Sequence, residues 1–129
     1  MQEKAEEGPE VPRGDSDLLL RLARIVFYPE SGVRPGESCQ LIVVLGGVRP
    51  ARDQIVQLEY SAFEGVERTK PIDPRIILED MPPDVSIGPE ENPKMIYLSI
   101  RHEAPRPSTL EVTLRLNDTS RSAEVQITD

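Results

Sequence analysis

The chain has 129 residues, a length typical of one domain, with 37% apolar residues, 4% aromatic residues and no Trp. Its formal net charge is −8, and an acidic surface repels phosphate backbones and anionic lipid, so nucleic acid and membrane surfaces are not expected as partners. No run approaches the roughly 18 apolar residues of a membrane-spanning helix, so membrane insertion is not expected.

The N-terminal segment, residues 1–17, carries six acidic and two basic side chains and almost nothing to bury. Such a segment cannot offset the entropy of ordering, so we expect a disordered acidic leader or linker over 1–17 and one domain over 18–129. The acidic residues after Met1 do not form a signal peptide. The sequence therefore indicates either a cytosolic protein or a piece of a longer exported chain.

Short apolar or alternating segments follow, separated by Pro and Gly. The run 38–45 is almost continuously apolar, so we expect a central strand that is covered on both faces. Residues 76–78 lie between Pro74 and Pro82-Pro83, which favours a short edge strand or a packed loop. The pattern predicts the other strands over residues 20–28, 54–61, 85–87 and 94–101.

The C-terminal segment, residues 108–129, has the strongest alternation in the chain. Its apolar positions fall on one face of two runs that flank a turn at Asn117, and these positions are Leu110, Val112, Leu114, Leu116, Ala123, Val125 and Ile127. A hairpin with one apolar face needs a second layer to cover it. About seven strands without a βαβ rhythm predict an all-β fold, an immunoglobulin-like antiparallel β-sandwich.

The order of turns resembles a family of bacterial immunoglobulin-like modules that occur in tandem in exported and surface proteins. The resemblance covers about residues 23–127. It rests on the turn at 28–33 (YPESGV), on Pro35-Gly36-Glu37-Ser38 before a Val/Leu strand, on Pro50-Ala51 before the third strand, on residues 82–88 (PPDVSIG) and on the Asn-centred final turn. Residues 69–81 depart from the pattern as an insertion, and Asp53-Gln54 replaces the family's Gly before Val56.

The resemblance implies a non-enzymatic spacer, adhesion or interaction module of a larger protein, at the cell surface or outside the cell. The family's modules carry no catalytic residues and need no cofactor. The expected contacts are a protein partner or neighbouring domains of the same chain, and the isolated module is expected to be monomeric. An intracellular scaffold domain is the alternative if Met1 is the native start.

Catalytic groups are scarce. Cys39 is the only cysteine and lies in the apolar run, which favours a buried, inert thiol. His102 is the only histidine and is expected at the exposed end of a strand. Phosphate-binding glycine loops and zinc-binding motifs are absent from the sequence, so an enzyme is not expected.

A ligand-binding domain is the second hypothesis. Four acidic residues, Asp73, Glu79, Asp80 and Asp84, lie near one another in the sequence and could form an oxygen-rich Ca²⁺ site. Their spacing is not that of an EF-hand, so solvated loop charge is the favoured interpretation.

Three further features of the sequence are candidate surface sites. Arg13, Gly14 and Asp15 form an RGD tripeptide that resembles an integrin-binding motif, although its place in the leader favours an ordinary linker. Residues 117–119 match an N-glycosylation sequon, which a turn of Asn and Asp explains as well. Tyr97 alternates with inward residues and is expected to face solvent, as a weak candidate for carbohydrate stacking.

Overall fold

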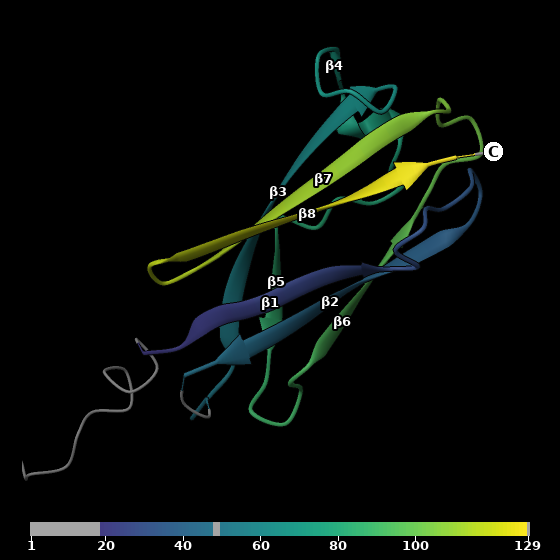
Figure 1. The fold of residues 1–129 in the computed structure, drawn as a ribbon. Coiled ribbons are helices and arrows are strands. Elements are labelled where there is room, and N and C mark those ends of the chain that lie inside the picture. The colour runs from purple at the N-terminus through teal and green to yellow at the C-terminus, as the bar shows by residue number, and fades with distance from the viewer. Residues whose placement is uncertain (1–18, 48–49, 129) are drawn as a thin grey trace, which may run out of the picture.

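The computed structural model describes residues 19–47 and 50–128, which form two antiparallel sheets packed face to face as an all-β sandwich (Figure 1). The smaller sheet has the order β1-β2-β6, formed by β1 (Arg21–Tyr28), β2 (Ser38–Gly46) and β6 (Lys94–Ser99). The larger sheet has the order β4-β3-β7-β8, with β5 paired to β3. Its strands are β3 (Gln54–Glu64), β4 (Pro71–Ile72), β5 (Asp84–Ile87), β7 (Ser108–Leu116) and β8 (Thr119–Ile127).

The hairpin of β7 and β8 supplies much of one inner face, as its alternation predicts. Leu110, Val112 and Leu114 are fully buried, and Val125 and Ile127 are 2% exposed or less. The facing layer comes from the alternate residues of β1, β2 and β6, including Phe27, Cys39, Leu41, Val43, Ile96 and Leu98. Burying a Val, Leu, Ile or Phe side chain in this way stabilises the fold by about 1.5–3 kcal/mol.

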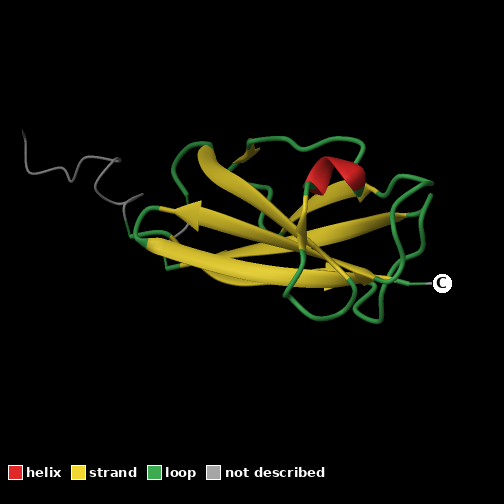
Figure 2. Ribbon diagram, turned by 90° about the horizontal axis from the view of Figure 1, so that it is seen from above, coloured by secondary structure: helices red, strands yellow, loops and turns green. Residues whose placement is uncertain are grey.

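The connection between β3 and β5 differs from the sequence-based expectation. β3 continues to Glu64 rather than ending at residue 61, because Phe63 and Glu64 pair with Thr109 and Ser108 of β7. The proposed insertion, residues 69–81, contains β4 and a 3₁₀ helix, η1 (Pro74–Ile76), which lies beside the stacked strands (Figure 2).

Of the two alternatives for residues 76–78, an edge strand or a packed loop, the structure shows the packed loop, with one strand-like contact. Ile77 and Leu78 are buried, and Leu78 forms an isolated antiparallel bridge with Ile100. Asp73 caps η1 by accepting a hydrogen bond from the Arg75 amide at 3.0 Å, and Pro74 fits the first helical position because no backbone N–H is needed there.

The expectation that the strand at 38–45 is covered on both faces is wrong. β2 is central in its sheet, but the described residues cover only one of its faces. Cys39, Leu41 and Val43 point inward and are buried, whereas Ile42 and Val44 on the other face are only half-buried. The apolar run in β2 therefore places apolar side chains on the outside of the sandwich.

Candidate interaction face

The outward side chains of the smaller sheet form a largely apolar surface, which we call the outer face. It consists of Arg24, Val26 and Tyr28 of β1, Gln40, Ile42 and Val44 of β2, and Met95 and Tyr97 of β6. The strand register places Val26, Ile42 and Met95 in one row across the three strands. The next row contains Tyr28 and Tyr97 on either side of Gln40.

The largest side chains of the outer face are open to solvent. Tyr97 is 67% exposed, Tyr28 is 62% exposed and Met95 is 46% exposed. Paired side chains on neighbouring strands lie about 4.5–5.5 Å apart at Cβ, so these residues form one continuous patch rather than scattered apolar groups. Contiguous apolar patches of a few hundred Å² on soluble domains commonly mark interaction sites.

The outer side of the larger sheet shows what a solvated face of this protein looks like. Its central paired positions are polar or charged: Gln57, Glu59 and Ser61 on β3, Glu111, Thr113 and Arg115 on β7, and Ser120, Ser122, Glu124 and Gln126 on β8. Apolar side chains occur on this side at the two ends of β3, where Ile55 is 51% exposed and Phe63 is partly buried. Arg115 and Glu59 form an ion pair at 3.2 Å, and the hydroxyls of Thr113 and Ser122 lie 2.8 Å apart. The two outer faces thus differ in chemistry although both belong to antiparallel sheets.

The outer face has no carboxylate. Arg24 is charged, and the exposed Arg21 lies beyond it at the start of β1, opposite Gly46, although the chain as a whole has a net charge of −8. Such a surface can be desolvated without burying unpaired carboxylates, which makes it suited to contact with another apolar protein surface.

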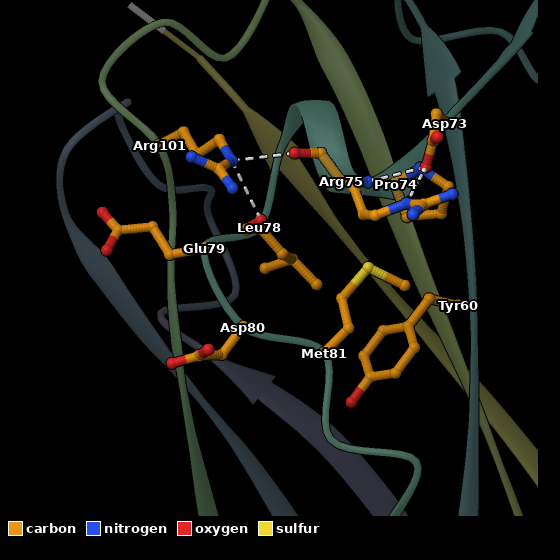
Figure 3. Close-up of a pocket in the computed structure, with 9 residues that line it drawn as sticks. All are labelled: Tyr60, Asp73, Pro74, Arg75, Leu78, Glu79, Asp80, Met81 and Arg101. Carbon is orange, nitrogen blue, oxygen red and sulfur yellow. Dashed lines mark hydrogen bonds and ion pairs between the residues drawn. The ribbon is translucent and has the colours of Figure 1, made fainter.

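The acidic candidates lie elsewhere, around a hollow of about 580 Å³ beside η1 (Figure 3). Asp73, Glu79 and Asp80 line this hollow, but Asp84 does not. Figure 3 shows Asp73 on one side and the carboxylates of Glu79 and Asp80 on the other, directed away from it.

Asp73 already has a partner. Its Oδ1 accepts hydrogen bonds from the Arg75 amide at 3.0 Å and from Arg75 Nε at 3.3 Å. These bonds, the backbone one most, lower the pKa of the Asp73 carboxyl below its usual value. Over residues 19–47 and 50–128, no three Asp, Glu, His or Cys side chains are grouped as a metal site would require.

The basic side chain of the hollow has a structural role. Arg101 Nε donates to the carbonyl of Arg75 at 2.8 Å and to the carbonyl of Leu78 at 3.1 Å (Figure 3). Tyr60, also on the rim, donates its hydroxyl to the Pro82 carbonyl at 2.7 Å. These polar groups hold the connection that follows η1 against the sandwich.

The remaining candidates do not form a site together. Cys39 is buried, and burial raises the pKa of its thiol to about 11, so the thiol is unreactive at neutral pH. His102 is exposed and stacks closely over Gly36, where an added Cβ would lie 2.6 Å from its Nδ1. The Arg13-Gly14-Asp15 tripeptide lies outside the described residues.

The turn at Asn117 has a backbone explanation. Asn117 adopts a left-handed conformation with φ of 54°, which Asn tolerates better than most residues. Its Nδ2 donates to the Leu20 carbonyl at 3.0 Å, which ties the hairpin to the start of β1.

The chain was compared with protein-family models, with curated proteins and with solved structures, and none of the three comparisons gave a match. Within the described part of the chain, no helix has the length and apolarity to cross a membrane.

Sequence reasoning found Tyr97 but not the surface to which it belongs. The exposure of Tyr97 is confirmed, whereas Tyr28, Ile42 and Met95 were not expected to join it. The run 38–45 already indicated this surface, because apolar residues occupy both its alternate sets of positions, those that point inward and those that point outward. Assigning that run to a strand covered on both faces left out the alternative, a strand with an apolar face toward solvent.

Proposed function

We propose that this domain is a non-enzymatic immunoglobulin-like interaction module of a larger surface or exported bacterial protein, and that it binds a partner protein through the outer face. The single observation that carries the proposal is the apolar grid of Tyr28, Ile42, Met95 and Tyr97, set against the polar outer side of the larger sheet. The partner is expected to present a flat surface with aliphatic or aromatic side chains at its centre.

The division of strands supports the immunoglobulin-like part of the proposal. Sheets β1-β2-β6 and β3-β7-β8 correspond to the A-B-E and C-F-G sets of that architecture. β5 occupies the place of strand D in the chain order but pairs with β3. This departure leaves the smaller sheet with three strands and keeps β6 at its edge.

The composition of the outer face supports binding to protein rather than to sugar or nucleic acid. Its exposed aromatic residues are two tyrosines set among aliphatic side chains, and Tyr and Met are enriched at protein interfaces. Two arginines at one end of β1, Arg21 and Arg24, offer little for a phosphate backbone in a chain of net charge −8.

The test compares two charge-bearing variants of the immobilised domain. Tyr28→Lys with Tyr97→Lys places two charges on the outer face, and Gln57→Lys with Ser61→Lys places two on the outer side of the larger sheet as a matched control. Proteins captured from an extract of the source organism are identified, purified and titrated against each variant. We expect the outer-face variant alone to weaken binding, by roughly tenfold or more, as hot-spot aromatics do.

Equal affinity of the two variants for every captured protein would refute a role for the outer face. Capture of no protein by the wild-type domain would indicate a spacer rather than a binding module. Circular dichroism of each variant checks that the fold is retained.

A further inference from the structure

The two long sides of the sandwich are closed to different extents. On the side of β1 and β8, the Leu22 amide donates to Thr119 Oγ1 at 3.0 Å, and Arg121 Nε donates to the Leu22 carbonyl at 3.1 Å. On the opposite side, β6 is the edge of the smaller sheet, and its neighbour along the chain, β5, belongs to the larger sheet. That side has an edge that further strand pairing could extend.

The direction of the backbone groups along β6 follows from the bonds at its end. Ile100 bonds toward β2: its amide donates to the Glu37 carbonyl at 2.9 Å and its carbonyl accepts from the Gly36 amide at 3.0 Å. The Ser99 carbonyl accepts from Glu79 on the other side, at 3.1 Å. Because successive residues of a strand alternate in direction, Tyr97 and Met95 also point their backbone groups to the open side.

The chain itself covers only the C-terminal part of this edge, at Ser99 and Arg101. Ile77 and Glu79 bond to Arg101 and Ser99, and the chain then leaves β6 at Asp80. No described residue provides a backbone partner for the outward groups of Met95 and Tyr97. A hollow of about 410 Å³, lined by Tyr97 and by Asp80, Met81 and Pro82, lies beside them.

We propose that a second copy of this chain pairs its β6 with this open edge, antiparallel and two-fold symmetric, with Tyr97 opposite Met95 of the second copy. The open stretch has two residues with outward backbone groups, Met95 and Tyr97. If Tyr97 of each copy exchanges backbone hydrogen bonds with Met95 of the other, the outward groups of both residues are paired in both copies. The alternative register, Tyr97 opposite Tyr97, would bring Met95 opposite Ser99, where Glu79 already lies. The product is one six-stranded sheet across two copies, an isologous contact of the commonest oligomer symmetry.

Side-chain chemistry favours the same register. The Tyr97 ring of one copy would lie beside the Met95 thioether of the other, a favourable sulfur–aromatic contact. Lys94 would lie opposite Leu98 of the second copy, next to where Glu79 and Asp80 of that copy end their own ladder. Lys94 now pairs with Glu91 at 2.9 Å, so the contact would add acidic neighbours to an existing cation.

This inference goes beyond the proposed function, because it concerns pairing through the backbone edge of β6, although two outer-face side chains, Tyr97 and Met95, would also meet there. It differs from the monomer expected from the sequence. The pairing would join two outer faces into one continuous surface. Because the edge offers few bonds and each copy carries a net charge of −8, the association is expected to be weak and to strengthen when salt screens the repulsion.

The test is sedimentation equilibrium of the full chain from micromolar to millimolar concentration. We expect a reversible shift to twice the monomer mass. Tyr97→Pro removes an outward amide at an edge position that tolerates proline and should raise the dissociation constant roughly tenfold or more. Tyr97→Thr keeps the amide and should raise it much less. A chain that stays monomeric at millimolar concentration overturns the proposal, and so does equal weakening by both variants.

A charge exchange tests the register without a proline. Lys94→Glu should weaken the dimer, and Lys94→Glu combined with Asp80→Lys should restore it. A double variant no better than the single one overturns the register. Hydrogen exchange of wild type supplies a further check: the amides of Met95 and Tyr97 should become protected as concentration rises, and unchanged exchange contradicts edge pairing.

Discussion

At the scale of residues, the outer face and the core differ in what a side chain does for the fold. Leu41 and Val43 of β2 are fully buried, whereas Ile42 between them is half-buried on the outer face. Truncating a buried leucine costs about 2–5 kcal/mol because it leaves a cavity. Substituting an exposed side chain such as Tyr28 usually changes stability by less than about 0.5 kcal/mol. The outer-face variants therefore report on binding with little effect on folding.

Cys39 gives a pH-dependent prediction. Burial raises the pKa of its thiol from an ordinary value near 9.0 to about 11. Below pH 9 the thiol is protonated in both states. Between pH 9 and 11 the unfolded chain loses this proton while the folded protein keeps it, so the free energy of unfolding falls as pH rises.

The measurement is a series of urea melts of wild type and Cys39→Ala at pH 7.5, 9 and 10.5. The stability difference between the two proteins should decrease across this range. Tyr60, whose pKa burial raises to about 12, is present in both and cancels in the comparison. A difference that is constant with pH would contradict burial of Cys39.

At the scale of elements, the strands were predictable wherever alternation was long. The hairpin of β7 and β8 and the strand β6 appear where period-2 patterns place them, because one buried face fixes their register. β1 also lies where a strand was expected, although a bulge between Leu22 and Arg24 interrupts its alternation. η1 and β4 could not be found this way. Three residues of 3₁₀ helix and two of strand are too short for a period, and their positions depend on tertiary contacts such as those of Arg101.

Arg101 is expected to hold the connection after η1 in place. Arg101→Met removes the donor to the Arg75 and Leu78 carbonyls, and hydrogen bonds of a charged group contribute about 1.5–3 kcal/mol. Arg75→Met is the matched control, since Arg75 is largely exposed and pairs only locally with Asp73. Urea melts should show a larger loss of stability for Arg101→Met, and equal losses would contradict this role.

At the scale of the whole molecule, the sequence predicted the sandwich but not its exposed contact surface. Composition and turn spacing define two packed layers, because aliphatic strands must bury one face each. Whether the outward apolar side chains of β2 are covered depends on other segments of the fold, and the sequence pattern of β2 alone does not show where those segments lie. The candidate Ca²⁺ residues illustrate the same limit, since proximity in sequence brought Asp73, Glu79 and Asp80 to one hollow without converging their carboxylates.

The domain boundary gives a further prediction for the whole chain. The described core begins at Leu20, and residues 1–16 offer little apolar area to bury. A protein that begins at Asp17 should therefore melt within about 2 °C of the full chain, because the core that both proteins contain supplies the burial free energy. Differential scanning calorimetry of the two proteins checks this, and a drop of many degrees would show that the leader contributes to the fold.

The ties between β1 and β8 have a mechanical consequence. Leu22 bonds to Thr119 near one end of the sandwich, while Val33 bonds to Gln126 and Thr128 near the other, so the two segments run parallel (Figure 1). The described chain enters at the first end and leaves at the second. A pulling force applied through the two ends would act along the strands and load these bonds in shear. Bonds loaded in shear must break together rather than one after another, so the module would resist stretching along this axis.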